Sequence, residues 1–158
     1  MELEKPNFNI TKGFCGIGVY QPKTQENIGT LIRSAKQFGA DFVFTIGKRY
    51  KTQHSDVKLS RHIPIFNFKT IEECLDCLPP TKNLIGVDII KGSQPLKEFK
   101  HPKQGIYILG SEDNGLCKEI LTDKRFEYVH IEGKSSLNLA VAGSIILYDR
   151  FMQFNDSL

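Results

Sequence analysis

Five short runs of apolar residues recur along the chain, and each ends at a turn or a cluster of small residues. Their side chains are continuously apolar rather than alternating, which is typical of strands buried on both faces. The runs cover residues 14–20, 41–47, 84–90, 105–110 and 128–133. The pattern therefore predicts five strands in the interior of a sheet.

Segments with helical periodicity separate these runs, at residues 27–38, about 70–78, about 115–122 and 138–154. In the first segment the apolar side chains share one face, and Arg33 points nearly opposite. Asn27 stands where a helix N-cap is expected, and Gly39 where the helix should end. The alternation predicts one α/β domain over residues 1–158, with a mostly parallel sheet covered by helices on both faces.

The segments that follow the five runs are polar or contain glycine. Ligands of open parallel sheets bind beyond the carboxyl ends of the strands, so we expect a site there. The first of these segments, QPKTQEN, has no glycine for a dinucleotide motif. Gly110 and Gly115 have P-loop spacing, but Leu116 and Cys117 follow where Lys and Ser or Thr are needed. Neither phosphate-binding motif is therefore predicted.

The amino-acid composition is that of an ordinary globular protein. Hydrophobic residues make up 40% of the chain and charged residues 25%, as in ordinary soluble globular proteins. No apolar run approaches the ~20 residues of a membrane helix, and the first residues lack the form of a signal peptide. We therefore expect a cytoplasmic protein without a membrane partner.

The distribution of charge is more informative than the net charge of +3. Residues 48–61 hold five Lys or Arg and one Asp, a local surplus larger than that of the whole chain. Tyr50 and His54 are interleaved with them, as where a segment meets phosphates and a base. An RNA-contacting segment and a solvated surface loop both fit this pattern. The candidate RNA-binding residues are Lys48, Arg49, Lys51 and Arg61.

Cys74 and Cys77 form a lone C-x-x-C motif within TIEECLDCLPP. A zinc site would need a second pair of cysteines, or histidines at ligand spacing, and none lies close in the sequence. Helical spacing instead directs Cys74, Leu75 and Leu78 toward the core. We predict no metal site.

Three motifs together resemble the signature motifs of the SpoU (TrmH-like) branch of the SPOUT RNA methyltransferases. They are NIGTLIRSAKQFGA at 27–40, LGSEDNGL at 109–116 and SSLNLAVAGSIILYDR at 135–150. The resemblance implies a C-terminal trefoil knot, S-adenosylmethionine as cofactor, RNA as substrate and a homodimer. The compact length is similar to that of the small TrmL-like members, which methylate a wobble ribose, and so implies tRNA rather than rRNA.

The resemblance also assigns roles to individual residues. The implied catalytic residues are Asn27, Arg33, Glu112, Ser136 and Asn138. The implied cofactor-binding residues are Asp88, Gly110, Ile131, Ser136 and Leu139. One departure is Glu132, which replaces the proline common after the isoleucine of this loop.

The implied reaction is methyl transfer to a ribose 2′-hydroxyl. Arg33 would receive the proton or stabilise the developing alkoxide. Charge stabilisation is the role that its chemistry favours, because arginine is a poor base. A non-catalytic RNA-binding knotted dimer and a SPOUT enzyme that methylates a base are the alternatives.

The segment 139–148 is apolar nearly all round, which predicts one side on the sheet and another on a partner subunit. Its small residues are predicted to let the backbones of two subunits approach. They are Ala140, Ala142, Gly143 and Ser144.

Overall fold

The computed structural model describes residues 13–51, 63–80 and 83–155. Within these residues, seven parallel strands form one sheet in the order β3-β2-β1-β6-β4-β7-β5. The strands are β1 (Phe14–Tyr20), β2 (Phe42–Ile46), β3 (Ile65–Phe68), β4 (Leu84–Val87), β5 (Gln94–Pro95), β6 (Gln104–Leu109) and β7 (Phe126–His130). All five predicted strands are present, but β4 ends at Val87 and β7 at His130, each three residues before the predicted end. Strands β3 and β5 are two further strands at the edges of the sheet.

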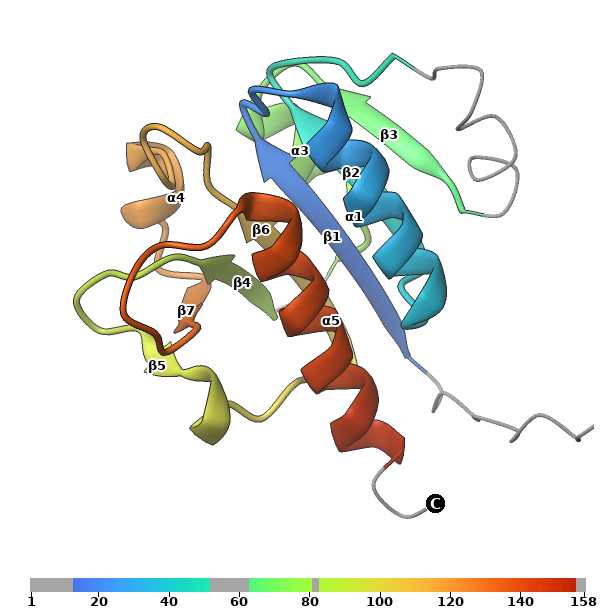
Figure 1. Cartoon of the computed structure of the whole chain (residues 1–158). Coiled ribbons are helices and arrows are strands. Elements are labelled where there is room, and N and C mark those ends of the chain that lie inside the picture. The colour runs from blue at the N-terminus through green and yellow to red at the C-terminus, as the bar shows by residue number, and fades with distance from the viewer. Residues whose placement is uncertain (1–12, 52–62, 81–82, 156–158) are drawn as a thin grey trace, which may run out of the picture.

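Helices cover both faces of the sheet, as predicted (Figure 1). The helices are α1 (Gln25–Gln37), α3 (Ile71–Cys77), α4 (Lys118–Leu121) and α5 (Leu139–Asn155), with a 3₁₀ turn, η1 (Leu96–Glu98). Buried side chains of α1 and α5 pack with one face in one core, and those of α3 and α4 pack with the other face in a second core. The knot implied by the resemblance stays a prediction.

The start of α1 differs from the sequence prediction. Thr24 is the N-cap: its backbone is extended and its Oγ1 accepts a hydrogen bond of 3.4 Å from the Asn27 backbone N–H. Asn27 therefore lies inside the first turn, and its assignment as the cap was wrong. This frees its amide side chain for contacts elsewhere. The predicted end of the helix is confirmed, because Gly39 has a φ of +74°.

The small residues of α5 serve the packing of this chain on itself. A Cβ added to Gly143 would lie 2.5 Å from Leu31 Cδ1 on α1. Ser144 Oγ lies 2.6 Å from Ser34 Oγ on the same neighbouring helix. Gly143 is buried against its own chain, so the prediction that it lets two subunits approach was wrong, while for Ser144 that role stays a prediction. Both residues let α1 and α5 approach over the sheet.

Tyr50 and Cys74, which the sequence offered as candidates for an RNA contact and for a C-x-x-C site, both lie in the hydrophobic core. Tyr50 is only 3% exposed and belongs to a buried hydrophobic cluster, so the interpretation in which it meets a base was wrong. His54 lies outside the described residues. Cys74 is buried, and this burial raises the pKa of its thiol to about 12, so it stays protonated at neutral pH. Its predicted core orientation is confirmed.

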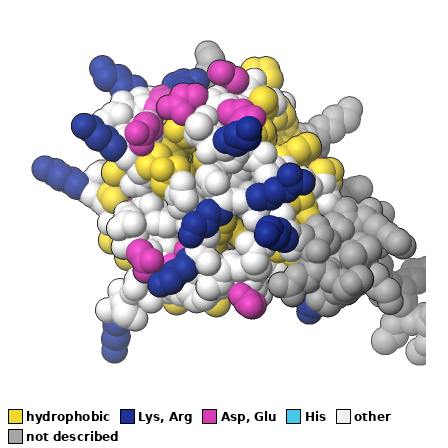
Figure 2. All heavy atoms as spheres, turned by 90° about the horizontal axis from the view of Figure 1, so that it is seen from above, with side chains coloured by type: hydrophobic (Ala, Val, Ile, Leu, Met, Phe, Trp, Pro, Cys, Tyr) yellow, Lys and Arg dark blue, Asp and Glu magenta, His cyan; other side chains and the backbone are white. Residues whose placement is uncertain are grey.

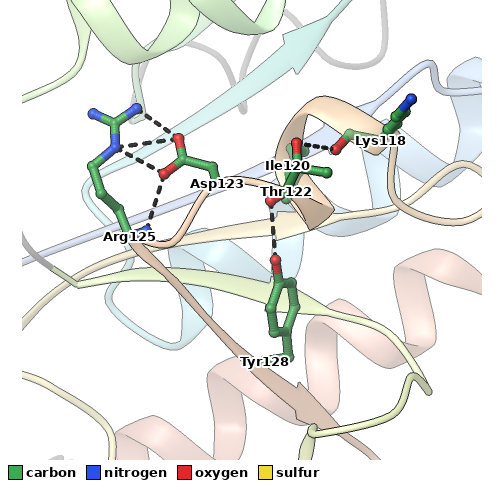
Figure 3. Close-up of polar contacts among 6 residues, drawn as sticks. All are labelled: Lys118, Ile120, Thr122, Asp123, Arg125 and Tyr128. Carbon is green, nitrogen blue, oxygen red and sulfur yellow. Dashed lines mark hydrogen bonds and ion pairs between the residues drawn. The ribbon is translucent and has the colours of Figure 1, made fainter.

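A polar cluster fixes the connection from α4 to β7 (Figure 3). Arg125 donates to both carboxylate oxygens of Asp123, with Nη2 at 2.7 Å from Oδ2, and these bonds lower the pKa of that carboxyl. Tyr128 Oη donates to the Ile120 carbonyl over 3.0 Å. These contacts hold β7 in position, and its carboxyl end reaches the site described below. Among the described residues, no helix has the length and apolarity needed to cross a membrane.

Candidate functional site

A pocket of about 440 Å³ lies at the carboxyl ends of β4, β6 and β7 and the start of α5, where the sequence predicts a site. Its size is that of a small-molecule site. The lining mixes apolar and hydrogen-bonding groups. It consists of Val87, Asp88, Ile89, Leu109, Gly110, Ser111, Glu112, Gly115, His130, Ile131, Ser135, Ser136, Leu137, Asn138, Leu139 and Ala142. All five residues predicted to bind a cofactor line this pocket.

The wall after β6 is a tight loop that depends on glycine. The backbones of Ser111 and Gly115 exchange two hydrogen bonds of 3.0 Å, which fold the loop back on itself. A Cβ on Gly110 would lie 2.3 Å from the Gly115 carbonyl carbon, so only glycine fits there. Asp88 Oδ2 accepts a 3.2 Å bond from the Leu116 N–H. This carboxylate braces the loop.

Hydrogen bonds join the three motifs beside the pocket. Asn27 Nδ2 donates to Glu112 Oε1 over 2.9 Å, and Asn138 Nδ2 donates to Asn27 Oδ1 over 3.0 Å. The second oxygen of Glu112 accepts a 3.1 Å bond from the Lys23 backbone N–H. Three residues separated by 85 and 111 positions therefore form one connected chain. Each side chain is fixed in orientation before any ligand arrives.

Asn138 also organises the start of α5. Its Oδ1 accepts from the N–H groups of Ala140 and Val141, at 2.9 and 3.2 Å, so the side chain caps the helix. The preceding loop is exposed and includes Ser136, which lines the pocket. The residues predicted as catalytic in the second and third motifs thus lie at the pocket.

Arg33 lies elsewhere in this chain. It is exposed on α1, has no hydrogen-bond or ion-pair partner among the described residues, and is absent from the pocket lining. Its Cα lies roughly 9 Å further along the helix axis than that of Asn27. Its neighbour Ser34 contacts Ser144 on α5. The structure does not bring Arg33 to the other predicted catalytic residues.

The described part of the basic segment lies close to the start of α1. Lys48, Arg49 and Lys51 are exposed, while Arg61 lies outside the described residues. The Lys51 N–H donates a 2.8 Å bond to Gln25 Oε1, which ties the segment to the first turn of α1. Figure 2 shows Lys and Arg side chains spread across the molecule's upper face, with most acidic side chains gathered at one border.

Several residues that line the pocket were not predicted as site residues from the sequence. Ile89 is an apolar side chain that is 65% exposed, yet it lies within a segment that the apolar pattern assigned to a strand. His130 ends β7, whereas the apolar run of residues 128–133 placed it inside a strand, so the sequence offered no signal for it. Within the described ranges, no three His, Cys, Asp or Glu side chains form a group that could hold a metal ion.

Known proteins are similar to this chain over most of its length. The model of the SpoU rRNA Methylase family matches residues 16–148. An uncharacterized tRNA/rRNA methyltransferase of Borreliella burgdorferi is 28% identical over 137 residues, which are 82% of this chain and 60% of that protein. The chain thus spans about 60% of the length of this relative.

Two solved structures share the fold. One, described as giving structural insights into the 2-OH methylation of C/U34 on tRNA, has a TM-score of 0.75 at 25% identity and covers 91% of this chain and 98% of its own. The other is the SpoU methyltransferase AviRb of Streptomyces viridochromogenes in complex with AdoMet. It has a TM-score of 0.69 at 24% identity and covers 92% of this chain and 60% of its own.

Proposed function

Because the chain belongs to the SpoU rRNA methylase family, we propose that it transfers a methyl group from S-adenosylmethionine to a ribose 2′-hydroxyl of RNA. The observation that carries this proposal is the bonded chain of Asn27, Glu112 and Asn138 at the edge of the pocket. The structure concerned with 2-OH methylation of tRNA supports ribose chemistry, and its similar length supports tRNA as the substrate class.

The pocket suits the proposed cofactor. Its apolar side chains, such as Ile131 and Leu139, can cover the purine, and its serines and backbone groups can bond the hydroxyl and amino groups. The described lining contains no Lys or Arg, which disfavours a di- or triphosphate. When bound, S-adenosylmethionine supplies a methyl group already activated by its sulfonium. Asp88, Gly110, Ile131, Ser136 and Leu139 would hold it.

Besides binding the cofactor, the protein must align the ribose 2′-hydroxyl and stabilise the negative charge that develops on its oxygen as the proton leaves. Glu112 orients the Asn27 amide, and Asn27 in turn orients Asn138, so the three act as a preorganised set. Ser136 has no hydrogen-bond partner among the described residues and can bond an incoming ligand. Arg33 supplies a fixed positive charge for the developing alkoxide.

A homodimer would bring Arg33 of one subunit to the pocket of the other. Exposed apolar side chains lie on α5, namely Val141, Tyr148 and Met152. Tyr148 contacts Phe38, the residue that caps the C-terminus of α1, edge-to-face with ring centroids 5.4 Å apart, so this apolar surface continues to the end of the helix that carries Arg33. We propose that two copies pair through α5 and that Arg33 acts at the pocket of the partner subunit.

The dimer is tested by placing a charge on this surface. Val141→Glu should shift the protein to monomer or unfold it, because dimerisation would bury an unpaired carboxylate. Leu121→Glu is the matched control, since Leu121 is similarly exposed at 42% but lies on α4, across the sheet. Sedimentation velocity at micromolar concentration reads the state. A monomeric wild type would contradict the dimer.

The basic segment is proposed to contact RNA phosphates. Replacing Lys48, Arg49 and Lys51 together with alanine should weaken binding and lower the slope of log affinity against log salt by roughly 0.7–0.9 for each phosphate that is no longer neutralised. A triple variant of Lys97, Lys100 and Lys103 removes the same charge near the amino end of β6 and should leave the slope unchanged. If wild type and both triple variants show the same salt dependence of RNA affinity, the basic segment is a solvated surface loop and does not contact RNA.

The activity itself is tested by transfer of a labelled methyl group. Purified protein is incubated with labelled S-adenosylmethionine and with either unmodified tRNA or unmodified rRNA. We expect incorporation into tRNA and little into rRNA. Preferential incorporation into rRNA would contradict the substrate class while leaving the enzymatic activity intact.

A further inference from the structure

His130 is a pocket residue that has no part in the proposed transfer of the methyl group. It ends β7, lines the pocket and is half-buried. Its Nδ1 lies 2.9 Å from Ser93 Oγ, in the segment that enters β5. The imidazole therefore stands between the pocket and the loop that connects β4 to β5.

The hydrogen bonds of Ser93 fix which ring nitrogen carries the proton. Ser93 Oγ donates its single hydrogen to the Ile90 carbonyl over 2.6 Å. The hydroxyl must therefore accept from His130, and Nδ1 must be the donor. In the neutral ring Nε2 then carries a lone pair, and it has no partner among the described residues.

The other strongly polar side chains of the pocket are already engaged. Asp88 accepts from the N–H groups of Ile89 and Leu116. Both oxygens of Glu112 and both polar atoms of Asn138 also have partners. Of the carboxylate, amide and imidazole nitrogen and oxygen atoms in the lining, Nε2 of His130 is the one without any hydrogen-bond partner among the described residues.

The loop beside His130 is held in place from both ends. Ser93 N–H also bonds the Ile90 carbonyl at 3.1 Å, and Gly92 between them has a φ of +90°, as a tight turn requires. Asp88 anchors the other end through the Leu116 N–H. Nδ1 of His130 thus steadies the loop that carries Ile89, and Nε2 remains for a ligand.

We propose that His130 contacts the cofactor directly and that its Nε2 accepts a hydrogen bond from an N–H or O–H group of S-adenosylmethionine. This inference rests on the proposed function, because it assumes that the cofactor occupies the pocket. The residue would select for a ligand that presents a donor at this point, and the Ser93 contact would keep the ring in the accepting tautomer.

The two amide side chains separate the roles of the two nitrogens. Asparagine places its amide near Nδ1 and can keep the Ser93 contact, whereas glutamine reaches the position of Nε2. Calorimetric titration with S-adenosylhomocysteine should give near wild-type affinity for His130→Gln. His130→Asn and His130→Ala should each bind roughly tenfold more weakly, as for the loss of one buried hydrogen bond. Thermal melts confirm that each variant is folded.

The outcomes are decisive in both directions. A glutamine variant that binds no better than alanine, or an asparagine variant that binds like wild type, would overturn the proposal. Wild-type protein that binds no S-adenosylhomocysteine would instead contradict the proposed cofactor, and the inference with it. Titration with 5′-methylthioadenosine, which lacks the amino-acid tail, assigns the donor. Weaker binding that persists with this ligand places the donor on the adenosyl part, and weaker binding confined to S-adenosylhomocysteine places it on the amino group; either result supports the contact.

Discussion

Replacing Arg33 with alanine should lower the turnover of methyl transfer by about 10²–10³-fold, as for loss of a donor that stabilises developing negative charge. Cofactor affinity should not change, because Arg33 is proposed to act on charge that develops only during the transfer. The melting temperature should hardly change, since exposed substitutions usually alter the unfolding free energy by less than about 0.5 kcal/mol. Labelled transfer assays, titrations and thermal melts measure the three quantities.

Further variants of Arg33 distinguish its role from a structural one. Arg33→Lys should recover only part of the activity, because an ammonium group cannot reproduce the planar guanidinium. A large fall in melting temperature for Arg33→Ala would show a structural residue. Turnover close to wild type would remove Arg33 from the mechanism.

A heterodimer tests whether Arg33 acts across the proposed interface. Co-expression of Arg33→Ala subunits with Gly110→Val subunits leaves one pocket intact, and that pocket faces an intact Arg33 of the partner subunit. The heterodimer should then regain roughly half of the wild-type activity. If Arg33 serves its own pocket, both sites are defective and the heterodimer is inactive.

Replacing Gly110 with valine is expected to weaken cofactor binding strongly. Even the first carbon of the new side chain would lie 2.3 Å from the Gly115 carbonyl carbon and 2.5 Å from the Leu116 nitrogen. The loop must therefore open, and overpacking of this kind typically costs about 1–3 kcal/mol, or roughly 5- to 150-fold in affinity if the cost falls on the bound state. Calorimetric titration with S-adenosylhomocysteine measures the change in affinity.

Gly133→Ala is the matched control for this substitution. Gly133 lies in the exposed loop before α5, and a Cβ there would meet nothing closer than the Ser135 carbonyl oxygen at 3.8 Å. This variant should bind as wild type does. Binding retained by Gly110→Val would show that the cofactor does not depend on the loop after β6.

The interior of the fold could be predicted because its strands are buried on both faces. Residues 14–20 and 105–110 are continuously apolar, and they form the neighbouring central strands β1 and β6. The edges could not be predicted in the same way. Strand β3 is half-exposed, only four residues long and interrupted by Asn67, and β5 has two residues, so neither gives a continuous apolar run. Their pairing depends on neighbours distant in sequence.

The local geometry of the site could not be predicted from the sequence either. Thr24 rather than Asn27 caps α1, because backbone geometry decides which of several capping residues is used. The motifs identified Asn27, Glu112 and Asn138 through a resemblance, and the structure adds that they bond to one another. His130 and Ser93 carry no motif, and their contact spans 37 residues, so only the fold reveals it.

Identifying the methylated nucleoside most directly tests whether the protein is a ribose methyltransferase. tRNA methylated by the purified protein is digested to nucleosides and examined by mass spectrometry, with Arg33→Ala as the control. We expect a nucleoside in which fragmentation leaves the added methyl group on the sugar, and which the control lacks. A methyl group on the base, or none in any RNA supplied with S-adenosylmethionine, would contradict ribose methylation.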